Sequence, residues 1–155
     1  MGQSTDGQIF FGVLLEEGAE FPWDGDPFGG DIDDWWIMKV KKWNPPFELY
    51  DESGEFLPGM ETDENIDVYY ESKYKFKSEN PLPVELVNVC SAEYPIYGLA
   101  VLGTYMFASR GYPESFNPLD LTFTKENLDK LLNFLDETGI ESDSEPQWYL
   151  SSYWG

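Results

Sequence analysis

The chain of 155 residues contains no histidine and a single cysteine, Cys90. Without histidine it lacks the commonest general base and the imidazole ligands of many metal sites. One cysteine excludes an internal disulfide framework and a multi-cysteine zinc site. We therefore expect no metal and no cofactor. Because no nucleophile is paired with a base, we also expect that the protein is not an enzyme.

Positive charge is scarce as well. Lysine and arginine together number 9, Arg110 is the only arginine, and 30 acids bring the net charge to −21. Such a field repels nucleic acid and anionic membranes and attracts basic proteins. No apolar run approaches the roughly 20 residues of a membrane-spanning helix, and the first residues lack the basic and apolar regions of a secretory signal. We expect a soluble, intracellular protein with no direct nucleic-acid or membrane partner.

Apolar and aromatic residues are abundant by contrast. Hydrophobic residues make up 41% of the chain and aromatic residues 17%, a content that a disordered acidic tail does not have. A chain of this length can bury a core of its own. The sequence predicts a single globular domain over 1–155. Its polar and aromatic C-terminal tail, about 140–155, is expected to dock on its own domain or on a partner.

The most continuous apolar segments lie in the middle of the chain. Residues 84–89 and 96–102 are rich in β-branched and aliphatic side chains and are joined by a turn at 91–95. They predict two adjacent buried strands around which the chain is organised. Further strands are predicted over 8–15, 35–43 and 105–109, with a short one over 47–50.

Residues 66–77 fit two patterns. Apolar and aromatic side chains from Ile66 to Phe76 alternate with lysines at a period of two, which favours a strand. A helix would also group Tyr69, Tyr70 and Lys73 on one stripe. The alternation favours the strand, and the helix stays the alternative.

The clearest helix is predicted over 125–138. Thr124 can cap its first turn, Leu128 and Leu131 belong to an apolar stripe, and Gly139 stands where a helix commonly ends. The predicted fold class is α+β. It is a single domain with a mainly antiparallel sheet packed by this C-terminal helix and with long acidic loops.

The acids are segregated from the bases along the chain. No lysine or arginine occurs before Lys39, between Lys42 and Lys73, or after Lys130, whereas acids are frequent in all three stretches and are interleaved with aromatic residues. One interpretation is a solvated surface that keeps the protein soluble. The other is a surface that imitates the phosphates of DNA, about one charge per 1.7 Å, and occupies the groove of a nucleic-acid-binding protein. The residues predicted to bind such a partner are Glu16, Glu17, Glu20, Trp23, Asp24, Asp26, Asp31, Asp33, Asp34, Asp51, Glu52, Glu61, Asp63 and Glu64.

Three other motifs are weaker. The acids at 24 and 26 followed by glycine at 29 echo a calcium loop, but Phe28 and Trp35 stand where oxygen ligands are required, so a polar turn is favoured. Cys90 and Ser91 have no histidine to activate them, and Cys90 is expected to be a small buried side chain. Arg110 is expected to lock its turn by pairing with a carboxylate.

Three stretches, in order along most of the chain, resemble a family of small acidic proteins of unknown function encoded by phages and prophages. The resemblance implies an accessory phage protein in the host cytoplasm, and no activity is carried over from the family. In similar proteins the stretch before Pro81 is often helical. The stretches are Gly2-Gln-Ser-Thr-Asp-Gly with Phe11-Gly12, Glu16-Glu17-Gly18 and Phe21-Pro22-Trp23; Pro81-Leu-Pro-Val-Glu-Leu with Cys90-Ser91, Tyr94-Pro95 and Leu99-Ala100-Val101; and Arg110-Gly111-Tyr112-Pro113.

These observations predict a non-enzymatic protein that binds a basic or nucleic-acid-binding host protein. By analogy with other small acidic phage proteins, it would be a DNA mimic that inhibits a host defence or nucleic-acid-processing system. The alternatives are a virion or assembly component and a protein that binds a small molecule, such as a nucleotide signal. The oligomeric state is left open. Only seven bases could supply the positive charge of a nucleotide site, namely Lys39, Lys41, Lys42, Lys73, Lys75, Lys77 and Arg110.

Overall fold

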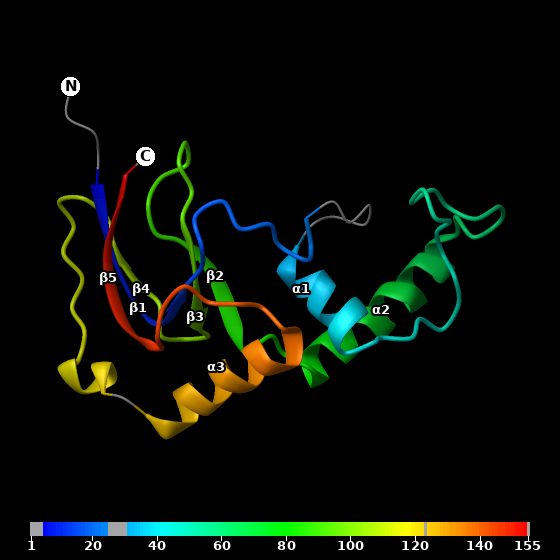
Figure 1. Cartoon of the computed structure of the whole chain (residues 1–155). Coiled ribbons are helices and arrows are strands. Elements are labelled where there is room, and N and C mark those ends of the chain that lie inside the picture. The colour runs from blue at the N-terminus through cyan, green and yellow to red at the C-terminus, as the bar shows by residue number, and fades with distance from the viewer. Residues whose placement is uncertain (1–4, 25–30, 123, 155) are drawn as a thin grey trace. The chain divides into compact units, whose positions relative to one another are not determined.

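The computed structural model describes residues 5–24, 31–122 and 124–154 (Figure 1). It confirms the predicted α+β class, with an antiparallel sheet and a C-terminal helix. Contacts divide the chain into unit 1 (Met1–Ala19 and Pro83–Gly155) and unit 2 (Glu20–Leu82). The single domain over 1–155 stays a prediction, because a division by contacts does not measure whether the units fold independently.

The sheet of unit 1 is built around β1 (Thr5–Leu14). Along one edge of β1, β5 (Gln147–Trp154) pairs antiparallel over eight residues. Along its other edge, β3 (Tyr97–Val101) pairs with residues 12–14 and β4 (Met106–Ala108) with residues 7–9. Phe10, Phe11 and Val13 are buried, as expected of a central strand that is covered on both faces. The strand predicted at 8–15 is therefore confirmed, and it is the organising element in place of 84–102.

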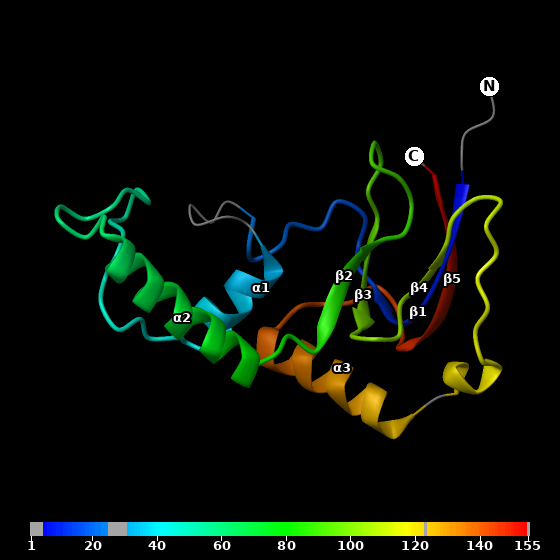
Figure 2. The same ribbon diagram turned by 180° about the vertical axis from the view of Figure 1, so that it is seen from behind.

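The two central apolar runs form the predicted neighbouring strands. β2 (Val84–Asn88) pairs antiparallel with β3, from Val84 opposite Val101 to Asn88 opposite Tyr97 (Figure 2). Beyond β2, Ser91 forms a bridge with Trp154 at the end of β5. Because this bridge joins the two outer segments of the sheet, the sheet curls on itself.

The predicted helix is α3 (Lys125–Thr138). The Thr124 hydroxyl accepts a hydrogen bond from the Asn127 N–H at 3.2 Å, and Gly139 ends the helix at φ 69°. Leu131 and Phe134 are buried, and α3 lies against β3. A short 3₁₀ turn, η2 (Pro118–Leu121), precedes it.

The aromatic end of the predicted tail is a strand that docks on its own chain. In β5, Tyr149 lies opposite Phe10 with ring centroids 5.7 Å apart, and Trp148 lies opposite Phe11 at the same separation. Aromatic cross-strand pairs stabilise a sheet beyond the area that they bury. These pairs help to hold the C-terminal end of the chain on β1.

The strand predicted over 35–43 is wrong. This segment belongs to α1 (Ile32–Trp35), which continues into a π-helical turn, η1 (Trp36–Val40). The carboxylate of Asp31 caps the start by accepting the Asp33 N–H at 2.9 Å. Only Met38 to Lys41 alternates in sequence, and so short an alternation does not distinguish a strand from a helix. The cap and the acidic first turn were the informative signals.

The strand favoured over 66–77 is also wrong, and the helical alternative holds. This segment lies within α2 (Asp63–Glu79). The Thr62 hydroxyl accepts the Asn65 N–H at 3.2 Å, and Asp63 and Glu64 lie in the first turn, where acids interact favourably with the helix dipole. Apolar side chains and lysines alternate at a period of two here, but apolar side chains also recur three and four residues apart. Periodicity alone therefore could not distinguish a strand from a helix.

The short strand predicted over 47–50 is wrong as well, because only Tyr50 forms a bridge, with Phe56, across a turn at 51–55. Two of the predicted acidic loops are likewise partly helical, in α1 and in α2. No helix in the described part of the chain is both long and apolar enough to cross a membrane.

Candidate functional site

Three of the predicted partner-binding acids hold unit 2 together. Asp31 caps α1, as described above. Asp34 lies 2.8 Å from the Lys73 ammonium and Asp33 lies 3.4 Å from that of Lys77, so both carboxylates join α1 to the second half of α2. The Lys73 pair is partly buried, which lowers the dielectric around it and makes it the stronger of the two. Their positions give these acids a structural role.

Two further predicted acids close turns. The Asp24 carboxylate accepts the Phe21 N–H at 3.0 Å. Asp51 accepts the Ser53 hydroxyl at 2.7 Å, the Ser53 N–H at 2.8 Å and the Glu55 N–H at 3.0 Å. These hydrogen bonds, the one from the Ser53 hydroxyl foremost, lower the pKa of Asp51.

Trp23 is part of a core and not of an open surface. It is 3% exposed, stacks on Phe21 with centroids 4.7 Å apart and contacts Trp35 at 5.4 Å. A side chain this deeply buried cannot serve as an exposed anchor without leaving its place. Asp26 and the other residues of the calcium-like motif up to Gly29 lie outside the described residues.

The remaining predicted acids are exposed, and their side chains have no hydrogen bond or ion pair with any residue that the structure describes. Glu16 and Glu17 belong to unit 1, and the others belong to unit 2. The contacts of Tyr50 with Tyr69 and Tyr70 hold the turn at 51–55 beside α2. These exposed acids are Glu16, Glu17, Glu20, Glu52, Glu61, Asp63 and Glu64.

The first half of α2 carries a continuous acidic face that the sequence prediction found only in part. Asp63, Glu64, Asp67 and Glu71, here called the acidic segment of α2, are all exposed. At about 100° per residue, the four lie within about 100° of the helix circumference, and they follow one another over about 12 Å of its axis. The spacing is about one carboxylate per 3–4 Å. It compares with about 3.4 Å of axis for each phosphate of one DNA strand.

Asp67 and Glu71 were missed because the strand predicted over 66–77 places them on the face that carries the lysines, whereas a helix brings them onto the same face as Glu64. The i, i+4 spacing from Asp63 was the available signal. Tyr74 lies on the same face one turn further on and is 64% exposed. An aromatic side chain therefore follows the carboxylates, as the mimicry interpretation requires.

Most basic side chains have a partner within their own unit. Two lysines pair with acids of α1, two pair with acids one turn away on α3, and one lies with its ammonium 4.4 Å from the centre of the Trp36 ring. In the four ion pairs each lysine neutralises one acid, so neither charge of the pair is left for a partner. These five lysines are Lys41, Lys73, Lys77, Lys125 and Lys130.

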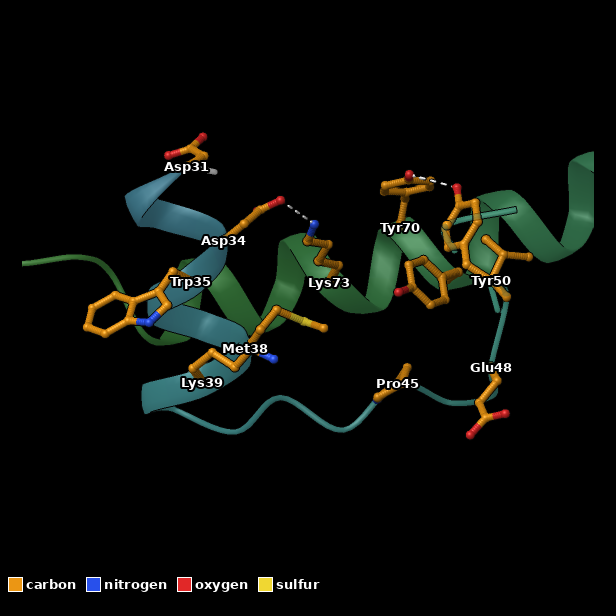
Figure 3. A pocket seen from close by; sticks show the side chains of 13 residues that line it. Asp31, Asp34, Trp35, Met38, Lys39, Pro45, Glu48, Tyr50, Tyr70 and Lys73 are labelled. Atoms are coloured by element: carbon orange, nitrogen blue, oxygen red, sulfur yellow. Dashed lines mark hydrogen bonds and ion pairs between the residues drawn. The ribbon is translucent and has the colours of Figure 1, made fainter. Parts of the chain in front are cut away.

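A pocket of about 580 Å³ lies within unit 2, between α1–η1, the segment 45–54 and α2 (Figure 3). We call it the tyrosine pocket. Asp31 and Glu48 lie toward opposite ends of it, and the Asp34–Lys73 pair and Tyr70 lie between them. The lining residues are Asp31, Asp34, Trp35, Met38, Lys39, Pro45, Glu48, Leu49, Tyr50, Gly54, Tyr69, Tyr70 and Lys73.

Two hydroxyls and one ammonium organise this pocket. The hydroxyls of Tyr50 and Tyr70 are hydrogen-bonded at 3.0 Å. This bond, followed by burial and the neighbouring phenols, raises the pKa of Tyr50 to about 12. Burial, followed by the charges of Tyr70 and Asp34, raises the pKa of Tyr69. The Lys73 ammonium lies 6.0 Å from the centre of the Tyr70 ring, so a cation already occupies a place between an aromatic face and a carboxylate.

The raised pKa of Tyr50 predicts a loss of stability in alkali. Below pH 10 this phenol is protonated in both states; from pH 10 to 12 the unfolded chain ionises first, so the free energy of unfolding falls. Tyr70→Phe removes the hydrogen bond, and we expect a shallower fall over this range in urea unfolding. Tyr112→Phe, at a residue 74% exposed, should keep the full slope. Equal slopes in all three proteins would contradict the assignment.

Unit 1 contains a second groove, of about 370 Å³, on the face of the sheet that carries Gln8 and Glu85. Burial raises the pKa of Glu85, and burial is also the main reason that the pKa of Tyr105 is raised. The Gln8 side chain accepts the Ser151 hydroxyl at 2.9 Å. No group of three metal-ligating side chains occurs within the described ranges.

The other motifs have structural positions. Cys90 is half-buried, its N–H is bound by the Asn88 side chain, and the Ser91 hydroxyl accepts the Tyr94 N–H at 3.0 Å. At Arg110 the backbone N–H, and not the guanidinium, donates to a carboxylate, that of Asp6, at 2.8 Å. The guanidinium forms no ion pair within the described part of the chain. The prediction that the Arg110 side chain holds this turn by pairing with a carboxylate is therefore wrong.

Comparison with protein families, with characterised proteins and with solved structures finds no match. The resemblance to phage proteins therefore stays a prediction.

Proposed function

We propose that this protein binds a basic nucleic-acid-binding protein through the acidic segment of α2 and the turn beside it, and thereby blocks that protein's access to nucleic acid. The observation that carries the proposal is the arrangement of Asp63, Glu64, Asp67 and Glu71 on one exposed helical face. Their spacing approaches that of the phosphates on one strand. A basic groove that binds DNA through the phosphate charges would attract these carboxylates by the same electrostatic interaction.

Two further features support the proposal. Of the three lysines in the second half of the same helix, Lys73 and Lys77 point to Asp34 and Asp33, so only the exposed Lys75 is left to compensate the acidic segment of α2. Placing like charges four residues apart also costs helix stability, by a few tenths of a kcal/mol for each pair. A partner that carries positive charge offsets this cost.

The proposal extends to the biological setting that the resemblance suggests. The protein would be a non-enzymatic accessory protein of a phage in the cytoplasm of its host. Its partner would be a host defence or nucleic-acid-processing protein. Small size and high negative charge suit such an inhibitor, because charge complementarity accelerates association with a basic target.

Competition with DNA tests the proposal. Immobilised protein captures its partner from host lysate, salt elutes it, and the purified partner is bound to a fluorescent duplex. We expect the protein to displace the duplex in an anisotropy titration, and the displacement to weaken as salt rises. A partner that binds the protein and the duplex at the same time, or capture of a virion protein that resists salt, would refute mimicry.

A further inference from the structure

The tyrosine pocket is rich in hydrogen-bond acceptors and poor in free donors. Three carboxylates line it, those of Asp31, Asp34 and Glu48, together with the hydroxyl pair. Of its two ammonium groups, the one on Lys73 is already bound to Oδ2 of Asp34. The complementary ligand is therefore a cation that carries several N–H donors.

The walls of the pocket are aromatic as well as acidic. Trp35, Tyr50, Tyr69 and Tyr70 all line it, and Lys73 already places an ammonium near the Tyr70 ring. Aromatic faces attract cations through the ring quadrupole. The position of Lys73 shows, within the molecule itself, the kind of group that this environment holds.

We propose that the tyrosine pocket receives the guanidinium of an arginine side chain from the basic partner, a specificity that rests on the proposed function. A guanidinium is planar, stacks on aromatic rings and presents paired donors, whereas an ammonium is a compact, strongly hydrated charge. Lys73 donates to Oδ2 of Asp34, which leaves Oδ1 as a further acceptor, and the hydroxyls of Tyr50 and Tyr70 add acceptors to the same pocket lining. The pocket volume lies within the range of ligand sites.

A nucleotide fits this pocket poorly. Lys39 and Lys73 are the two bases that line it, and three carboxylates oppose them in a protein whose net charge is −21. Phosphates would enter against both the local and the long-range field. The same field draws a guanidinium inward.

The position of the pocket fits a partner that lies on α2. Around the helix, Tyr70 lies about 20° from Asp63 and about 60° from Asp67. Tyr70 therefore separates the acidic segment of α2 from the pocket. A basic chain that pairs with the carboxylates can extend one arginine across the Tyr70 ring into the pocket.

Two peptides of equal length and charge test this proposal, one of alternating arginine and glycine and one of alternating lysine and glycine. Isothermal titration of the full chain should show the arginine peptide binding on the order of 5-fold more tightly. Tyr70→Leu should bring the ratio of dissociation constants close to one. Tyr70→Phe, which keeps the ring, should preserve the preference, and Tyr112→Leu in unit 1 is the matched aromatic control.

Removing the resident cation gives the opposite result. Lys73→Gln should increase the preference for arginine, because it frees Asp34 and the face of Tyr70. Lys75→Gln makes the same change of charge two residues further along α2, where the side chain is exposed, and should strengthen the binding of both peptides equally. Thermal melts of each variant establish that it is folded.

The outcomes distinguish failure of the arginine pocket alone from failure of the proposed function. Equal binding of the two peptides overturns the arginine pocket and leaves the acidic surface as the binding site. Binding of neither peptide overturns the proposed function as well. If the protein lacks arginine preference and ATP raises its melting temperature, the pocket is a nucleotide site and the proposal is wrong.

Discussion

Replacing the acidic segment of α2 by amides, with Asp63→Asn, Glu64→Gln, Asp67→Asn and Glu71→Gln together, will weaken binding of the basic partner by about 100-fold. The estimate takes about 0.7 kcal/mol for each exposed charge pair and adds the four. The side chains keep their size and shape, so the change is one of charge alone. Titration calorimetry at low salt measures it, and the slope of log affinity against log salt should fall at the same time.

The matched control neutralises four exposed acids of unit 1, Glu93, Asp136, Glu141 and Glu145. It changes the net charge by the same amount but should lower affinity only slightly, because these acids are not part of the proposed contact and salt screens their long-range effect. The α2 variant should remain folded. It loses favourable interactions of the first turn with the helix dipole but also loses repulsion between acids four residues apart.

Two results would contradict the prediction. Unchanged affinity in the α2 variant would place the partner elsewhere on the protein. An equal loss in both variants would show that only total charge matters, so that the acids are a solvated surface. Neutralising Asp31, Asp33 and Asp34 is the poorer experiment, because the cap of α1 and two ion pairs would be lost with the charge.

Replacing Gly12 by alanine will lower the free energy of unfolding by at least about 3 kcal/mol or prevent folding. A Cβ at this position would overlap the carbonyl oxygen of Leu99 and lie 2.8 Å from its carbon and 3.0 Å from the Cα of Ala100. All three atoms belong to the backbone of β3, which is held by β1 on one side and β2 on the other. A strand paired on both edges cannot move away without breaking the ladder.

Gly7 is the control within the same strand. Its Cβ would meet nothing closer than the Ala108 oxygen at 4.0 Å. Alanine there should leave stability unchanged or raise it by about 0.5 kcal/mol, because it restricts the unfolded chain. Urea unfolding followed by circular dichroism compares the two. A Gly12→Ala protein that unfolds like the parent would refute the close approach of β1 and β3.

Local signals predicted some elements accurately. The bounds of α3 follow from Thr124, Gly139 and the leucine stripe, because caps and periodicity act within a few residues. β2 and β3 were predicted from short apolar runs. Both failures at α1–η1 and α2 came from alternation taken as decisive where a cap signal, Asp31 or Thr62, pointed to a helix.

The candidate site was predicted in composition but not in arrangement. The acids of the first turn of α2 were identified, whereas Asp67 and Glu71 share a face with Glu64 only in a helix. Trp23 is of a residue type that often anchors an interface, yet it is buried against Trp35. The tyrosine pocket gave no signal, because Tyr50 and Tyr70 are 20 residues apart and meet only through folding.

The sequence by itself determined the charge of the surface, the absence of histidine chemistry, the α+β class and the segments able to form a buried sheet. These properties depend on residue type and on neighbours a few positions away. Only the tertiary structure decided that β1 is the centre of the sheet, that the aromatic C-terminal segment pairs with it, and which acids are used internally. The physical reason is that an ion pair or a strand ladder depends on distance in space, which joins residues such as Asp34 and Lys73 that the sequence keeps apart.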